Sequence, residues 1–306
     1  NTLISPFFFR FFLPLQLTSL FSLHIMDSAY WSYDNIVPSF RLDGKLVILT
    51  GGSGGLAAVV SRALLAKGAD VALVDMNLER TQQAARDVLQ WGEEQMKGKY
   101  ESPIGQVSAW SCNIGDAEAV DLTFKAINEH HGKISSVLVN TAGYAENFPA
   151  EEYPAKNAEN LMKVNGLGSF YVSQAFARPL IQNNMTGSII LIGSMSGTIV
   201  NDPQPQCMYN MSKAGVIHLA RSLACEWAKY NIRVNTLSPG YILTPLTRNV
   251  ISGHTEMKTE WESKIPMKRM AEPKEFVGSI LYLASESASS YTTGHNLVVD
   301  GGYECW

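Results

Sequence analysis

Apolar residues fall in short runs that alternate with longer stretches of mixed character from Leu46 to the carboxyl terminus. Seven of the short runs are rich in β-branched side chains and have the length of buried strands. The longer stretches repeat apolar positions at helical spacing. This alternation is typical of βα units around a parallel sheet. The pattern predicts an α/β fold with a doubly wound, seven-stranded parallel sheet in a single domain of the Rossmann type.

The predicted strands share an apolar run bounded by turn residues: Leu46–Thr50, Asp70–Asp75, Val107–Asn113, Ser136–Thr141, Ser188–Ile192, Arg233–Leu237 and Asn296–Asp300. The predicted helices lie between them: Leu56–Ala66, Leu78–Met96, Ala117–His131, Ala158–Asn183, Met208–Tyr230 and Pro273–Ser285. The segment from His254 to Met270 is less regular and contains Trp261 and Pro266. It is either a substrate lid or a plain surface connection.

The amino-terminal 25 residues differ from the rest of the chain. Residues 1–25 are rich in Phe and Leu, carry Arg10 as their only formal charge and are interrupted by Pro6 and Pro14. They contain no uninterrupted apolar run long enough to span a bilayer. We expect translation to begin at Met26 and residues 1–25 to be upstream sequence, with a mitochondrial presequence as the alternative. Residues 26–41 then form an extension, and residues 42–306 form the main domain.

Composition narrows the possible partners. Charged residues make up 17% of the chain and the net charge is −4, so there is no broad cationic surface for nucleic acid. The four cysteines include no CxxC pair, and the six histidines include no HExxH spacing. We therefore expect no disulfide framework and no metal site. Neither nucleic acid nor a membrane is an expected partner.

A glycine-rich turn joins the first predicted strand to the first predicted helix. It reads Thr50-Gly51-Gly52-Ser53-Gly54-Gly55-Leu56-Ala57. Glycines let the backbone approach a pyrophosphate, whose charge then lies at the exposed N–H groups of the following helix. The candidate cofactor-binding residues in this turn are Gly51, Ser53, Gly55 and Leu56.

Asp75 ends the second predicted strand, about twenty residues after the glycines. A carboxylate there accepts a hydrogen bond from an adenosine ribose hydroxyl and repels a 2′-phosphate. At about 4 Å and an effective dielectric of about 20, the repulsion costs roughly 4 kcal/mol, or nearly three decades of affinity. The position therefore favours NAD over NADP. A helix N-cap is the alternative role for Asp75, and the two roles are compatible.

Tyr209 and Lys213 lie four residues apart at the start of a long predicted helix, so they share one face. A tyrosine that acts as a base near neutral pH must lose about three pKa units, and one nearby cation supplies about one to three. Lys213 alone is borderline, and the positive charge of an oxidised nicotinamide adds to it. The pair is weak evidence alone, because a buried ring and a solvated amine are common on helix faces.

Polar residues follow the fifth predicted strand. Ser194 lies at its carboxyl end, where ligands bind in open parallel sheets, and Ser196 is a competing hydroxyl. A serine there is also a common turn former. The loop that follows contains four side chains that suit a polyhydroxy ligand: Asn201, Asp202, Gln204 and Gln206. Because Pro203 and Pro205 make this a turn-rich loop, we favour a purely structural role for these four.

The combination of motifs resembles the short-chain dehydrogenase/reductase family over Leu42 to Tyr303. The resembling elements are the glycine turn, Asn140-Thr141-Ala142-Gly143, Asn165, Ser194, Tyr209 with Lys213, and Ser238-Pro239-Gly240-Tyr241-Ile242-Leu243-Thr244. Three positions depart from the family pattern, with Ala57 for a third glycine, Thr141 for asparagine and Asn113 for an aspartate near the adenine. These changes affect cofactor affinity rather than the chemical step.

The resemblance implies roles for individual residues. Tyr209 would exchange the proton, Ser194 would position the substrate oxygen, and Lys213 would bind the nicotinamide ribose. Asn165 would hold a water that links Lys213 to solvent. The remaining cofactor contacts would be Asn113 at the adenine, Asn140 and Gly143 in the cleft, and Ile242 and Thr244 at the carboxamide.

Within the family the chain is most similar to fungal polyol dehydrogenases, on the segments 30–35, 51–58 and 300–306. This implies NAD-linked interconversion of D-arabinitol and D-ribulose in the cytoplasm by a homotetramer. Two alternatives stay open. One is an NADP-linked ketose reductase of the same fold that acts on fructose, sorbose or xylulose. The other is a dinucleotide-binding sensor without turnover, which the complete set of Asn165, Ser194, Tyr209 and Lys213 disfavours.

Overall fold

The computed structural model describes residue 32 and residues 36–98, 105–245, 247–248 and 255–305. Residues Ser39–Trp306 form one compact unit, and residues Asn1–Pro38 form a separate one. The predicted limits 1–25, 26–41 and 42–306 stay predictions. The description below concerns the larger unit.

A seven-stranded, all-parallel sheet forms the centre of this unit, in the order β3-β2-β1-β4-β5-β6-β7. The strands are β1 (Leu46–Thr50), β2 (Asp70–Asp75), β3 (Val107–Ser111), β4 (Val137–Asn140), β5 (Gly187–Ile192), β6 (Ile232–Pro239) and β7 (Asn296–Val299). The strand order reverses between β1 and β4. In open parallel sheets ligands bind beside the carboxyl ends of the strands at this reversal. The predicted fold class is confirmed.

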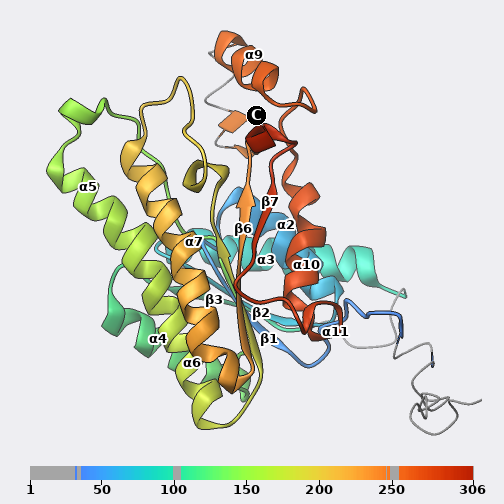
Figure 1. The fold of residues 1–306 in the computed structure, drawn as a ribbon. Helices are drawn as coiled ribbons and strands as arrows, with labels where there is room; N and C mark the ends of the chain where they lie inside the picture. Colours follow the sequence, from blue (N-terminus) through green and yellow to red (C-terminus); the bar gives the residue numbers. More distant parts are fainter. Residues whose placement is uncertain (1–31, 33–35, 99–104, 246, 249–254, 306) are drawn as a thin grey trace, which may run out of the picture. The chain divides into compact units, whose positions relative to one another are not determined.

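Helices cover both faces of the sheet (Figure 1). One face carries α4 (Ala117–His131), α5 (Ala155–Met162), α6 (Ser169–Gln182) and α7 (Cys207–Trp227). The other carries α2 (Gly55–Ala66), α3 (Leu78–Met96) and α10 (Val277–Ala284), and the short α11 (Glu286–Ser289) follows α10. α9 (Thr255–Lys264) lies beyond the carboxyl ends of the strands. No helix in the described ranges is long and apolar enough to cross a membrane.

The strands are apolar throughout because both faces of the sheet are buried. In β1, Leu46 and Ile48 pack into the cluster under α4, α6 and α7, which contains Phe124 and Phe176. Val47 and Leu49 pack into the opposite cluster under α2 and α10. Full burial of a phenylalanine ring stabilises the fold by roughly 2–3 kcal/mol, so the two layers hold the strand ends in fixed register.

The predicted helix Ala158–Asn183 is wrong as a single element. The structure has α5, then a π-helical segment Lys163–Gly168, then α6. The π-helical segment packs closely against the loop after β3 at Gly168. A Cβ atom on Gly168 would lie 2.9 Å from the Ile114 side chain, which is too close for any larger residue. The hydroxyl of Ser169 donates to the carbonyl of Asn165. Helical periodicity alone cannot show a π-helical insertion, because it depends on these contacts.

Other boundaries differ by a few residues. β3 ends at Ser111 rather than Asn113, because the Asn113 side chain accepts from the Gly115 N–H and starts a turn. The predicted helix Met208–Tyr230 ends in a 3-10 turn, and Pro273–Ser285 begins with one. The segment 254–270, expected to be irregular, contains α9.

Candidate active site

Two adjoining cavities follow the carboxyl edge of the sheet. One of about 770 Å³ runs from the glycine turn to Asn113, and one of about 400 Å³ extends from there past Ser194 and Tyr209. Both are lined by Thr141, Gly143, Tyr144 and Thr244. A further cavity of about 510 Å³ lies at the amino ends of the strands, and none of the predicted site residues lines it. The first two form the cleft described below.

The glycine turn approaches its neighbours too closely for side chains. Gly51 has a φ of +64°, and a Cβ atom there would lie 2.7 Å from the hydroxyl of Thr141. At Gly55 a Cβ atom would lie 2.9 Å from Pro245, on the far wall of the cleft. Side chains at these positions would narrow the 770 Å³ cavity where a pyrophosphate would enter.

The amino end of α2 opens into this cavity. Its N-cap, Gly54, has no side-chain oxygen to accept from the first-turn N–H groups, so these donors and the helix dipole are available to an anion. Leu56 and Ala57 both line the cavity; Leu56 is 8% exposed, and Ala57 is fully buried and packs in the core. Ala57 therefore serves helix packing, which accounts for the tolerated loss of a third glycine. The turn fits the pyrophosphate of a dinucleotide.

Asp75 lies at the mouth of the same cavity, at the end of β2. Its Oδ2 accepts from the N–H and the hydroxyl of Ser53, at 3.1 and 2.7 Å. The carboxylate is thereby held beside the glycine turn, as a ribose contact requires. It is not the N-cap of α3, which is Asn77, whose side chain accepts from the Arg80 N–H. The alternative role proposed for Asp75 is wrong, because the strand ends two residues before the helix cap.

The two predicted asparagine contacts differ. Asn113 is exposed and lines the 770 Å³ cavity. Asn140 is 2% exposed, and its side chain accepts from the Thr50 hydroxyl and donates to Ser169. Its side chain therefore links β1, β4 and α6 and lines neither cavity, and the predicted cofactor contact stays a prediction.

Tyr209, Ser194 and Lys213 meet in the 400 Å³ cavity. The Ser194 hydroxyl donates to that of Ser196 at 3.0 Å. It also accepts from the N–H of Ser196, so Ser194 forms a turn as well as a site. Burial raises the pKa of Tyr209, and the neighbouring Ser194 hydroxyl opposes that rise. The free chain therefore keeps Tyr209 protonated at neutral pH, so any activation must come with a ligand.

Lys213 is 6% exposed, and its ammonium lies 5.6 Å from the centre of the Tyr209 ring. Burial lowers the pKa of Lys213 to about 8. The ammonium donates to the carbonyl of Ile192 at 2.8 Å, at the end of β5. A cation is thus held in place beside the tyrosine at a cost in stability.

Asn165 and Gly143 pack beside Lys213. The Asn165 side chain accepts from the N–H of Tyr144 and donates to its carbonyl and to Ser212. A Cβ atom on Gly143 would lie 3.1 Å from Asn165 Oδ1 and 3.5 Å from the Lys213 ammonium. Asn165 therefore fixes the loop after β4 at the closest approach to the lysine. The predicted water contact stays a prediction.

Ile242 and Thr244 line the cleft where the segment after β6 crosses it. Ile242 forms a bridge with Ala271, and the Thr244 hydroxyl bonds with Thr247. Thr244 lines both cavities and Ile242 lines only the smaller one, and their predicted contact with the carboxamide stays a prediction. Within the described ranges, no group of three or more His, Cys, Asp or Glu side chains could hold a metal ion.

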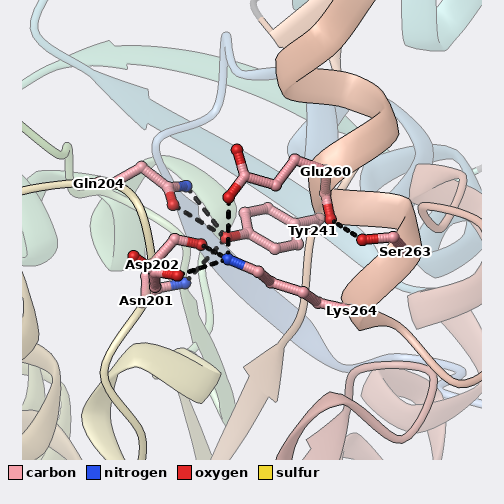
Figure 2. Close-up of polar contacts among 7 residues, drawn as sticks. All are labelled: Asn201, Asp202, Gln204, Tyr241, Glu260, Ser263 and Lys264. Carbon is pink, nitrogen blue, oxygen red and sulfur yellow. Dashed lines mark hydrogen bonds and ion pairs between the residues drawn. The ribbon is translucent and has the colours of Figure 1, made fainter.

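Sequence patterns gave no sign of two aromatic residues in the 400 Å³ cavity. The rings of Tyr241 and Trp261 stack at 4.5 Å between centroids. Figure 2 shows the Tyr241 hydroxyl between the amides of Asn201 and Gln204, with which it bonds at 3.0–3.2 Å. These aromatic residues come from segments about twenty positions apart, so only the fold reveals the pair.

The insertion helix α9 is joined to the loop after Ser194 (Figure 2). The Lys264 ammonium donates to the carbonyl and carboxylate of Asp202, at 2.8 and 2.6 Å, and to Glu260 at 3.0 Å. Trp261 on the same helix is 7% exposed and lines the cavity. The segment is thus a wall of the cavity, while movement as a lid stays a prediction.

Comparisons with known proteins agree with this arrangement. A family model described as enoyl-(acyl carrier protein) reductase matches residues 51–304. The D-arabinitol 2-dehydrogenase [ribulose-forming] of Candida tropicalis is 96% identical over 280 residues, which cover 92% of this chain and 99% of that protein. The NADH-dependent L-xylulose reductase of Ambrosiozyma monospora is 56% identical, covering 88% and 98%.

A solved short-chain type dehydrogenase/reductase from Mycobacterium marinum superposes with a TM-score of 0.79 at 34% identity, covering 87% of this chain and 98% of that one. The chain belongs to the short-chain dehydrogenase/reductase family. A nicotinamide dinucleotide is therefore its cofactor, and the glycine turn, the α2 amino end and Asp75 fit that group.

Proposed function

We propose that the protein oxidises D-arabinitol to D-ribulose with NAD⁺ as hydride acceptor. The observation that carries the proposal is the 96% identity to the Candida tropicalis enzyme over nearly the whole of both chains. The joint placement of Ser194, Tyr209 and Lys213 in one cavity supports turnover. The reaction converts the secondary alcohol to a ketone, with the hydride passing to the nicotinamide and the proton to the protein.

The side chains divide this work. Tyr209 takes the alcohol proton, and Ser194 bonds the same substrate oxygen and keeps it at the tyrosine. Lys213 provides a positive charge beside the phenol ring, and the bound oxidised nicotinamide supplies a second one. Together these charges oppose the burial that raises the pKa of Tyr209 in the free chain. Lys213 also lies where a ribose hydroxyl can accept from its ammonium.

We further propose that NAD is preferred over NADP, on the basis of Asp75. A neighbouring cavity of about 270 Å³ is lined by Arg62, Arg80 and Asp87, and by Ser53, which bonds to Asp75. Those two cations would suit a 2′-phosphate if the carboxylate were absent. The negative charge of Asp75 thus decides the preference.

Two alternatives are tested by one assay. One alternative is an NADP-linked ketose reductase of the same fold. A solved gluconate 5-dehydrogenase from Burkholderia cenocepacia, in complex with NADP, superposes with a TM-score of 0.77 at 28% identity, covering 87% of this chain and 98% of that one. A sensor without turnover is the other. Purified full-length protein is offered NAD⁺ or NADP⁺ with a panel of pentitols and hexitols, and the ketose is identified. We expect NADH and ribulose from D-arabinitol. A higher kcat/KM with NADP⁺ contradicts the cofactor preference, and binding of NADH without turnover supports the sensor.

We also propose a homotetramer in the cytoplasm, on the family resemblance. Light scattering on the purified chain of 33.6 kDa tests the assembly. A mass of one or two chains contradicts it.

A further inference from the structure

Gln206 lies in the wall of the 400 Å³ cavity, three residues before Tyr209. It is 7% exposed and is the N-cap residue of α7, yet its side chain makes no capping hydrogen bond. A long polar side chain buried beside a catalytic centre needs another purpose, because an unpaired buried amide is costly.

Three acceptor oxygens surround the amide nitrogen of Gln206. They belong to Ser196, Asn201 and Asn210, at 3.2, 2.8 and 2.9 Å. The two hydrogens of the amide nitrogen are shared among these three acceptors. The carbonyl end must therefore point away from all three.

Among the residues that the structure describes, no side chain or N–H donates to the side-chain oxygen Oε1 of Gln206, whereas its backbone carbonyl accepts from the Asn210 N–H. The indole nitrogen of Trp261 is fully enclosed and has no hydrogen-bond partner. The side-chain oxygen of Gln206 also has no partner, but it is not fully enclosed. It is therefore open to the cavity that Gln206 lines, as an acceptor held in one orientation.

We propose that Gln206 is a specificity-determining residue whose carbonyl oxygen accepts a hydrogen bond from a substrate hydroxyl next to the reacting carbon. This inference rests on the proposed polyol oxidation. A polyol and its ketose both carry such a hydroxyl, whereas a simple secondary alcohol does not. Because the amide is already fixed by three neighbours, little side-chain entropy is lost on binding.

The Gln206 amide is also joined to the proposed catalytic serine. Its nitrogen donates to the Ser196 hydroxyl, which in turn accepts from Ser194 at 3.0 Å. Recognition of the neighbouring hydroxyl is thus built on the same network that positions the reacting oxygen. A substrate without that hydroxyl leaves the Gln206 oxygen unpaired, which is how a site rejects an analogue that lacks a donor.

The test uses the full chain with Gln206→Leu and Gln182→Leu, each assayed with D-arabinitol, with D-ribulose and with a secondary alcohol that lacks the neighbouring hydroxyl. For Gln206→Leu we expect KM for D-arabinitol and for D-ribulose to rise roughly 10- to 100-fold, with kcat changed less and the Kd for NADH unchanged. For the alcohol that lacks the neighbouring hydroxyl, Gln206→Leu and the unmodified protein should have the same KM, because the Gln206 oxygen has no partner in either case. Gln182, the exposed last residue of α6, lines neither cavity, so its variant is the matched control with KM near that of the unmodified protein.

Three outcomes overturn the proposal. The first is a KM for Gln206→Leu within about twofold of the unmodified protein. The second is an equal loss with the alcohol that lacks the neighbouring hydroxyl, which assigns the role to the amide nitrogen as a structural donor. The third is absence of turnover in the unmodified protein despite NADH binding, which refutes the proposed function itself and is thereby distinguished from the other two.

Discussion

Replacing Lys213 by methionine should abolish activity and stabilise the free protein at the same time. The ammonium is 6% exposed, and burial lowers the pKa of Lys213 from 10.5 to about 8. At about 1.4 kcal/mol per unit, the folded protein bears a cost of about 3 kcal/mol for this charge at pH 7. Methionine removes that cost but leaves the Ile192 carbonyl without its donor, a loss of about 1–3 kcal/mol. The net gain is about 1 kcal/mol.

The pH dependence identifies the cause. The folded pKa of Lys213 lies below its unfolded value, so the unfolded state binds more protons between pH 8 and pH 10.5. The unmodified protein therefore gains stability as pH rises through this window, while the Lys213→Met protein does not. The advantage of the variant is full below pH 8 and disappears towards pH 10.5.

Urea unfolding of cofactor-free protein at pH 7 and pH 9.5 measures both effects, at matched protein concentration because assembly also affects stability. Lys97→Met, at an exposed lysine after α3, is the control and should change little. The reasoning is refuted if Lys213→Met is less stable by more than about 1 kcal/mol at pH 7 and the difference does not shift with pH.

Three further predictions concern the proton, the cofactor and pH. Tyr209→Phe should lower kcat by at least about 100-fold and leave NADH affinity, followed by fluorescence titration, within twofold; unchanged turnover contradicts the proposed base. Asp75→Asn should raise kcat/KM for NADP⁺ by roughly 100- to 1,000-fold. Adding Arg80→Gln to this variant should reverse part of that gain. An unaltered ratio of NADP⁺ to NAD⁺ activity refutes the role of Asp75. The side chain of His131 is fully buried, and burial lowers the pKa of His131 from 6.5. The unfolded state therefore takes up a proton that the folded state does not, and stability should fall as pH drops below 6.5. His131→Gln should reduce this fall in urea unfolding at pH 7.5 and 5.5, and equal slopes for both proteins count against it.

The sheet and the cofactor turn could be predicted from the sequence because their signals are local. A strand buried on both faces must be apolar along its length, as β1 is, and a pyrophosphate turn needs glycines between a strand and a helix. The same holds for Tyr209 and Lys213, whose four-residue spacing on a helix brings their side chains together in any fold. The sequence therefore predicted the residues that meet in the 400 Å³ cavity and several of those that line the 770 Å³ cavity.

Long-range contacts decided the rest. The side chain of Asn140 forms hydrogen bonds with Thr50 and Ser169. The helix around Asn165 contains a π-helical segment where it packs on the loop after β3. The loop after Ser194 was expected to be purely structural, yet Asn201 and Gln206 line the cavity while Asp202 bonds to α9. Neighbours in a loop point in different directions according to what packs against them. Sequence alone therefore determined which residues can do the chemistry, and only the tertiary structure decided which of the polar residues face the substrate.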